Sequence, residues 1–337
     1  MTVAADIHSR RKGAILGMFI GDALAMPVHW YYDRNALARD YGRVTGYITP
    51  RNPHPDSILW RSHYPAPAPS MDILHDQRPY WGRPGIHYHQ FLKAGENTLN
   101  LKLCRILIDT LVEKGGYDAD EYLARYIRFM TSPGSHRDTY VEEYHRHFFT
   151  RYARGTPPRA CGVIEKHISG VIGMIPLIVH YADDPELGRR QAFEHLRLTH
   201  LGDRMASAGK LVVDILQPVL SGESLLDVLT RAIRRQDHPM LGHPFFKWLA
   251  DPDEVVVGKR LSTACYVEEA MPATLYLALH YHQDVEGGLI ANTNLGGDNA
   301  GRGAVLGALL GAANGDGSFP ARWIEGLRHP PPSLHRD

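Results

Sequence analysis

The chain has 337 residues, of which 44% are hydrophobic and 22% are charged, and its 37 Lys and Arg residues balance 37 Asp and Glu residues. This composition predicts a soluble protein with a packed core. Formal neutrality disfavours broad electrostatic binding to nucleic acid or to an anionic membrane, and it favours a small-molecule partner. The 20 histidines predict a surface that becomes cationic below about pH 6.5.

The cysteines and the start of the chain give information on the cellular compartment of the protein. The three cysteines are widely separated and form no CxxC pair, which predicts unbridged thiols and a reducing, cytoplasmic compartment. These are Cys104, Cys161 and Cys265. Arg10-Arg11-Lys12 followed by apolar residues resembles a signal peptide only in part, because Asp22 interrupts the apolar run. No apolar run reaches the roughly 20 residues that span a bilayer, so we expect no membrane insertion.

Two series of glycines recur at every fourth residue, one near each end of the chain. They are Gly13, Gly17 and Gly21, then Gly303, Gly307, Gly311 and Gly315. A glycine inside a helix costs about 1 kcal/mol relative to alanine, so the series need a packing reason. Close contact between the two helices supplies one, and it favours a single domain over residues 1–337 with a flexible tail at 329–337. Asp22 and Asp298 adjoin the two series, so we expect a cleft that contains both carboxylates.

Helical periodicity dominates the sequence between the glycine series. Apolar residues recur at three- and four-residue intervals, proline and glycine punctuate them, and convincing alternation of period two is hard to find. We therefore predict an all-α fold, a compact bundle of many helices. Helices are expected at residues 99–112, 122–130, 163–181, 205–220, 225–233 and 266–282.

One long segment, residues 42–92, breaks the helical pattern and is rich in proline, histidine and aromatic residues. A loop of this length is usually functional or disordered, and its aromatic content disfavours disorder. Two interpretations stay open: a lid over the cleft, or a segment that wraps the surface of the bundle. Its aromatic side chains, Trp81 among them, would stack on a base of a ligand or fill space.

Several motifs resemble the ADP-ribosylglycohydrolase family. Residues 13–28, Gly-Ala-Ile-Leu-Gly-Met-Phe-Ile-Gly-Asp-Ala-Leu-Ala-Met-Pro-Val, resemble its opening signature, and residues 294–312 resemble its final metal-binding turn and helix. Gly95-Glu96-Asn97-Thr98 stands where that family carries Thr-Asp-Asp-Thr, and Thr199-His200 with Asp203 is similar to its mid-chain helix junction. The matches follow the family's order over residues 13–315, which implies its compact all-α fold.

The resemblance implies hydrolysis of the N- or O-glycosidic bond of an ADP-ribosyl, nucleotide or ribosyl group, on a small molecule or on an ADP-ribosylated protein. The family uses two Mg²⁺ ions held by clustered carboxylates. This sequence departs from that pattern, because the closing Asp-Thr-Asp-Thr appears as Asp298-Asn299-Ala300-Gly301 and the glutamate after the opening helix is missing. Two dications need more charge than Glu96 and Asp298 supply, so at most one weakly held Mg²⁺ is expected on these two residues.

The resemblance and the residue chemistry together give a candidate site. Glu96 and Asp298 are the expected catalytic carboxylates, with His29 for acid–base chemistry near neutral pH. Arg302 enters the first turn of the closing helix, where we expect it to hold a phosphate or carboxylate. The expected substrate-binding residues are Asn97, Thr98, Asn299, Arg302, His200 and Trp81.

Each candidate also has a plainer interpretation. Asp22 is expected to brace buried backbone, and Glu96 with Asn97 would simply begin the helix that follows. An alignment shift of two residues would bring Thr98 and Asn100 into the ligand positions instead. A chain that keeps the fold for binding or structure, without catalysis, is the alternative function.

The histidines offer a competing hypothesis of a zinc or iron site. His87 and His89 would share one face of an extended segment, and further nitrogen ligands would come from elsewhere in the chain. The candidates for those are His75, His136, His145 and His147. A hydrogen-bonded or solvated pair is the favoured interpretation of this motif.

Overall fold

A computed structural model describes residues 6–334, and it confirms the all-α prediction. Strand structure in the described residues is confined to one parallel pair, β1 (Val163–Ile164) and β2 (His200–Leu201). The α-helices are α1 (Ile7–Ala25), α2 (Arg34–Tyr41), α3 (Leu99–Lys114), α4 (Ala119–Thr131), α5 (Glu143–Ala153), α6 (Ser169–Ile172), α7 (Ile175–His180), α8 (Pro185–Thr199), α9 (Asp203–Leu220), α10 (Leu225–Arg235), α11 (Phe245–Trp248), α12 (Asp253–Val255), α13 (Val267–His280), α14 (Val285–Leu295), α15 (Asn299–Asn314) and α16 (Ala321–Gly326).

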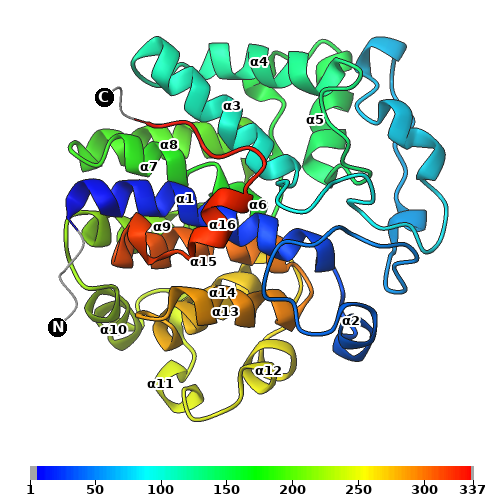
Figure 1. Cartoon of the computed structure of the whole chain (residues 1–337). Coiled ribbons are helices and arrows are strands. Elements are labelled where there is room, and N and C mark those ends of the chain that lie inside the picture. Colours follow the sequence, from blue (N-terminus) through cyan, green and yellow to red (C-terminus); the bar gives the residue numbers. More distant parts are fainter. Residues whose placement is uncertain (1–5, 335–337) are drawn as a thin grey trace.

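The centre of the molecule is the pair of glycine-bearing helices, α1 and α15, which lie side by side (Figure 1). A Cβ atom built on Gly17 would lie 2.0 Å from the carbonyl oxygen of Gly307, and one built on Gly307 would lie 2.0 Å from the oxygen of Gly17. Gly21 and Gly303 repeat this contact one turn away, where a Cβ on Gly21 would lie 2.0 Å from the Gly303 oxygen. The two backbones therefore touch directly, and the predicted packing is confirmed.

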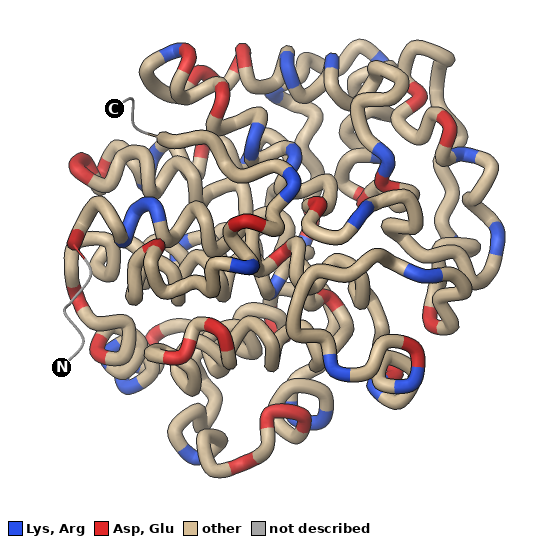
Figure 2. Tube along the Cα trace, in the orientation of Figure 1, with Lys and Arg blue, Asp and Glu red and all other residues tan. Residues whose placement is uncertain are grey.

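The other helices enclose this pair. Helices α13 and α14 pack on α15, α7 and α9 also contact the pair, and α3, α4 and α5 lie beyond them on the opposite side from α13 (Figure 1). One large hydrophobic cluster runs through the described residues, and a smaller one lies beneath α2. Figure 2 shows acidic and basic residues interspersed along the chain. Among the described residues, no helix has the length and apolarity needed to cross a bilayer.

The helix predictions differ in outcome. The predictions at 99–112, 122–130, 205–220, 225–233 and 266–282 are confirmed within a few residues, whereas the single helix predicted at 163–181 is wrong. That region begins with β1, because the Glu165 N–H donates to the Leu201 carbonyl, and then divides into α6 and α7 at Gly173. Seven α-helices of the described residues were not indicated by the periodicity: α2, α5, α8, α11, α12, α14 and α16.

The segment 42–92 contains three short 3₁₀ turns and no α-helix. Many of its apolar side chains are buried in the protein, including Leu59, Ile73, Tyr88 and Leu92, whereas Ile58, Trp60 and Phe91 are exposed. This burial supports the wrapping interpretation, and it also brings side chains of the segment to the ends of α1 and α3. Whether the segment moves as a lid stays a prediction.

The predicted tail, residues 329–337, is described as far as residue 334, and residues 335–337 lie outside the described part. Leu334 is buried, and the Arg105 side chain donates to the His329 carbonyl. The described part of the tail therefore lies against the protein.

The backbone contact between α1 and α15 predicts a large penalty for one methyl group. Gly307→Ala would place Cβ 2.0 Å from the Gly17 oxygen, so we expect a loss of about 2 kcal/mol or more despite the better helix propensity of alanine. Thermal and urea unfolding measure it. Gly317→Ala is the control, because its Cβ would meet nothing within 4 Å, and equal stability of the two variants would contradict the packing.

Candidate active site

The turn before α15 fixes the position of Asp298. Gly296 and Gly297 have φ values of 69° and 63°, which favour glycine. The Trp30 N–H donates to the Gly297 carbonyl at 2.8 Å, and the Gly297 N–H donates to the Tyr31 carbonyl at 2.7 Å. Asp298 then caps α15, its Oδ1 accepting from the Gly301 N–H at 3.0 Å. The turn thus ties the start of α15 to the residues that follow α1.

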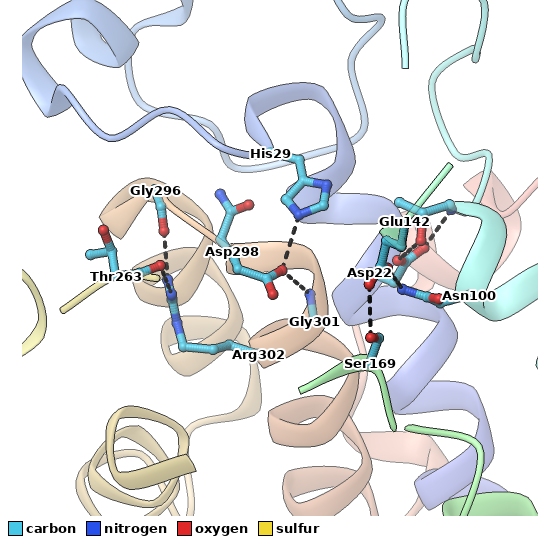
Figure 3. Close-up of polar contacts among 12 residues, drawn as sticks. Asp22, His29, Asn100, Glu142, Ser169, Thr263, Gly296, Asp298, Gly301 and Arg302 are labelled. Atoms are coloured by element: carbon cyan, nitrogen blue, oxygen red, sulfur yellow. Dashed lines mark hydrogen bonds and ion pairs between the residues drawn. The ribbon is translucent and has the colours of Figure 1, made fainter. Parts of the chain in front are cut away.

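Asp298 begins a buried series of polar side chains, and Figure 3 shows its first contact, with His29. Its Oδ1 lies 3.0 Å from His29 Nε2, and His29 Nδ1 lies 2.8 Å from His89 Nε2. His89 Nδ1 lies 3.2 Å from Asp138 Oδ1, and Asp138 Oδ2 accepts from the Lys102 ammonium. Two imidazoles therefore stand between two buried carboxylates, and a lysine at the far end neutralises one of them.

Proton counting constrains this chain. Hydrogen bonds at all three contacts between Asp298 and Asp138 require three protons, whereas two neutral imidazoles carry two. The pKa of His89 is lowered by burial, which disfavours an extra proton there. Burial would raise the pKa of Asp138, but Lys102 and then His89 lower it below its ordinary value, so this carboxyl stays ionised. Asp138 therefore acts only as a hydrogen-bond acceptor for His89 and Lys102.

A second carboxylate, Glu142, lies directly before α5. Asn100 Nδ2 donates to its Oε1 at 2.6 Å, and Ser169 Oγ donates to its Oε2 at 2.8 Å. These donors come from the first turn of α3 and from α6 (Figure 3). Three segments distant in sequence therefore hold one carboxyl group in place.

The pKa values of the two carboxyl groups are shifted in opposite directions. Burial raises the pKa of Glu142, and the charge of Asp298 adds to this while His167 opposes it. Burial also raises the pKa of Asp298. The hydrogen bond from His29, its charge and the charge of Arg302 outweigh this effect, so the pKa of Asp298 lies below its ordinary value. Such a divergence between neighbouring carboxyls is a common arrangement for one acid and one charged partner.

Cys265 lies close enough to both carboxylates to feel their charge. Burial raises the pKa of its thiol first, and the charges of Asp298 and Glu142 raise it further. The thiol therefore stays protonated at neutral pH, and nucleophilic thiolate chemistry is disfavoured here.

An aromatic cluster adjoins His29. The Trp30 ring stacks on His29 with centroids 3.9 Å apart, and the Tyr140 ring meets Trp30 edge-on at 4.8 Å. Trp81 stacks against Tyr140 at 6.1 Å and donates from Nε1 to the Thr139 carbonyl. Trp30 has a left-handed φ of 62°, which is rare for a bulky residue and is often found at functional sites. The half-buried rings could stack a planar ligand.

Comparison with known proteins decides the family. The family model for ADP-ribosylglycohydrolase matches residues 4–337. The chain belongs to the ADP-ribosylglycohydrolase family. A solved structure described as an "ADP-ribosylglycohydrolase-related protein complex" is similar over 96% of this chain and 93% of that chain, with 23% sequence identity and a TM-score of 0.62. At that identity the likeness shows the fold. No curated protein matches the sequence.

Glu96 and the two residues after it have hydrogen-bond partners within the protein. Glu96 Oε1 accepts from Arg137 Nη2 at 2.7 Å, and its Oε2 accepts from the Lys93 N–H at 2.7 Å. Asn97 donates to the Asp22 carboxylate at 2.8 Å, and Thr98 donates to it from both its N–H and its hydroxyl.

Asp22 therefore braces the start of α3, as its plainer interpretation held, and burial raises its pKa to about 6 against the hydrogen bonds from Thr98 and Asn97. Asn100, the residue reached by the shifted alignment, is the one that contacts Glu142.

Arg302 was expected to hold a phosphate or carboxylate of a ligand, but its guanidinium donates to protein groups instead. It is fully buried, and it donates to the Asn292 side chain and to the carbonyls of Thr263 and Gly296. Burial lowers its pKa to about 10, so it remains charged at neutral pH. Asn299 is also fully buried, with its Nδ2 donating to the Val28 and Thr293 carbonyls. Both side chains therefore stabilise the backbone around the turn at Gly296 and Gly297, and neither is available to a ligand.

The predicted metal ligands do not fit a dinuclear magnesium centre. Both oxygens of Glu96 accept hydrogen bonds from protein donors, and Asp298 Oδ1 faces His29 and the Gly301 N–H. Among the described residues no group of three or more His, Cys, Asp and Glu side chains is arranged to hold a metal. The zinc or iron hypothesis is also disfavoured, because both ring nitrogens of His87 have protein partners. Its Nε2 lies against the Pro27 carbonyl, and its Nδ1 accepts from the His89 N–H.

Sequence reasoning missed Glu142, Ser169 and the Asp138–Lys102 pair. Glu142 stands in an unremarkable Glu-Glu pair, and Ser169 and Lys102 have no motif around them. Only the three-dimensional approach of α3, α5 and α6 brings these side chains together. His89 was noticed, but as a metal ligand instead of a partner of His29.

The prediction that the histidines make the surface cationic is wrong for at least eight of them, which are buried in the described structure. Burial lowers the pKa to about 4 for His54, and to about 3 for His195 and for His200. The remaining buried histidines with lowered pKa values are His87, His89, His136 and His145. These rings stay neutral inside the folded protein.

This burial predicts loss of stability in mild acid. Below the ordinary pKa of 6.5 the unfolded chain takes up protons that the folded chain refuses, so the free energy of unfolding decreases as the pH falls. From about pH 7.5 to 5.5 the loss is about 1.4 kcal/mol per histidine, or about 4 kcal/mol for His54, His195 and His200 together. Urea unfolding at both pH values measures it.

The matched pair of variants is His195→Gln and His147→Gln. The first removes a buried ring and should reduce the pH dependence by about 1.4 kcal/mol, whereas the exposed His147 should leave it unchanged. Unfolding free energies that do not change between the two pH values would contradict the argument.

Proposed function

We propose that this protein hydrolyses a glycosidic bond of an ADP-ribosyl, nucleotide or ribosyl-type substrate, with Glu142 and Asp298 as its two working carboxyl groups. The observation that carries the proposal is the opposite shift of their pKa values within one polar cluster. Glycoside hydrolysis commonly uses one protonated and one ionised carboxyl group beside the scissile bond.

The chemistry assigns a role to each group. Glu142, whose pKa is raised, is the acid: it donates a proton to the leaving nitrogen or oxygen as the bond to the ribose anomeric carbon breaks. Ionised Asp298 stabilises the positive charge that develops on the ribose, and its Oδ2 accepts no hydrogen bond from the described residues. A water oxygen then bonds to the anomeric carbon, and its proton returns to Glu142. His29 keeps Asp298 charged and oriented.

The aromatic cluster supports a nucleotide-like substrate. Trp30, Tyr140 and Trp81 are half-buried, so each ring has an accessible part on which a base can stack. The leaving group would be a small molecule or a side chain of an ADP-ribosylated protein. The three cysteines are unbridged, which supports a reducing, cytoplasmic location.

The proposed reaction routes no step through a metal. Protein groups already contact the buried carboxylates: the Lys102 ammonium donates to Asp138, and His29 lies against Asp298. A single Mg²⁺ on Glu96 and Asp298 would have to displace Arg137 and His29 from them. We therefore expect turnover to persist in a chelator.

The test is release of ADP-ribose from N-linked and O-linked ADP-ribosyl substrates. Glu142→Gln and Asp298→Asn should each lower kcat by about 10²- to 10⁴-fold, because each removes a group that acts in the transition state. Glu143→Gln is the matched control, since Glu143 is exposed and pairs only with His147 among the described residues. Equal activity of wild type and Glu142→Gln would refute the assignment.

A binding role without catalysis is the second candidate. It is favoured by the engagement of Glu96 with Arg137, and by His89, which the 42–92 segment places against His29. Thermal midpoints measured with ADP-ribose, with Mg²⁺ and with both distinguish the cases, because a ligand that binds the folded state raises the midpoint. A rise with ADP-ribose and no turnover of any substrate would favour this role. A rise that requires Mg²⁺ would contradict metal-free recognition.

A further inference from the structure

A small polar cavity lies behind Glu142. Its volume is about 30 Å³, and its walls come from α3, α4, α5, α6, α8 and β2. The polar side chains used below are Asn100, Tyr144, Ser169 and His200. A water molecule needs about 10–15 Å³ of such space and two to four polar partners, so the cavity has room for about two waters.

His200 lines this cavity, and one of its ring nitrogens has no hydrogen-bond partner among the described residues. The ring is 3% exposed, and its Nε2 is buried with no hydrogen-bond partner among the described residues. Its Nδ1 lies 2.8 Å from Thr199 Oγ1. A buried nitrogen without a partner has lost its hydrogen bonds to water and gained none in return, so a partner in the cavity is favoured.

The ring of His200 is held in place from both sides. The Tyr144 ring lies 4.3 Å away between centroids, and a Cβ built on Gly170 would lie 2.9 Å from His200 Cδ2. The absence of a side chain at Gly170 therefore makes room for the imidazole. The orphaned nitrogen cannot easily turn toward another group.

The two donors that hold Glu142 line the same cavity. Ser169 gives its only hydroxyl hydrogen to Glu142 Oε2, so its oxygen can still accept a hydrogen bond. Asn100 gives one Nδ2 hydrogen to Glu142 Oε1, receives the Tyr144 hydroxyl at its Oδ1, and keeps a second Nδ2 hydrogen. Ser169 and Asn100 therefore each keep a hydrogen-bonding group for water in the cavity that His200 also lines.

We propose that this cavity is a binding site for ordered water, and that His200 acts through this water as a positioning residue for Asn100, Ser169 and hence Glu142. The water site stands on the cavity and the orphaned nitrogen alone. Its effect on catalysis rests on the proposed hydrolytic function. His200, expected from sequence to touch substrate, acts here from behind the carboxyl group.

The water site is tested without any substrate. A high-resolution crystal structure of the full chain should show about two ordered waters in the cavity, one within hydrogen-bonding distance of His200 Nε2. In solution, water protons should show cross-relaxation with the His200 ring protons. A cavity that holds no water in both measurements would overturn the proposal.

The positioning role is tested by a pair of variants. His200→Phe cannot bond to the water and should lower kcat roughly tenfold with little change in KM, because Glu142 loses its orientation. His200→Gln keeps a polar end and should restore kcat to within about twofold of wild type. Equal kcat values for His200→Phe and wild type, or equal losses in both variants, would overturn this role.

A further variant covers a failure of His200→Phe to fold. Ser169→Ala keeps the side-chain volume nearly constant but breaks the link between the water and Glu142. It should lower kcat while the water at His200 Nε2 remains in the crystal structure, and unchanged kcat would overturn the positioning role. Absence of turnover by the wild type with every substrate would refute the hydrolytic function and leave the water measurements to decide the site.

Discussion

The direct contact of two helix backbones, α1 and α15, is the constraint on which the rest of the structure depends. Side chains cannot separate these helices, because each glycine occupies the space that its partner's Cβ would need. This contact sets the end of α1 beside the start of α15. Asp22 lies in the last turn of α1, His29 comes shortly after that helix, and Asp298 caps the start of α15. The candidate site therefore forms at this end of the helix pair.

The site combines this fixed pair with groups from the outer helices and from the 42–92 segment. His89 of that segment reaches His29, and Asn100, Glu142 and Ser169 arrive from three separate elements. Protein cations and imidazoles stand beside the buried carboxylates, so the local charge is compensated by the chain itself.

Helices and contacts marked by a repeated sequence pattern were predictable, whereas the partners of individual side chains were not. The four-residue glycine spacing indicated both the helices and their contact, since periodicity and steric need point to the same partner. Asp22 could be interpreted as a brace because it lies inside that pattern. Glu142 could not be found, because its role depends on donors 42 residues earlier and 27 residues later that approach it only in the folded protein. Arg302 was misplaced for the same reason: its sequence position shows a helix start but not which side the guanidinium faces.

The pairing of the first and fifteenth helices has a consequence for how the protein is made. During synthesis α1 leaves the ribosome early, yet the surface that fits its glycine face is among the last parts of the chain to be translated. Contacts between such distant segments form late and slow folding. In the nascent chain, the glycine face of α1 therefore has no helix to pack against until translation is nearly complete. Loss of the final helices would remove the centre of the molecule, not its edge.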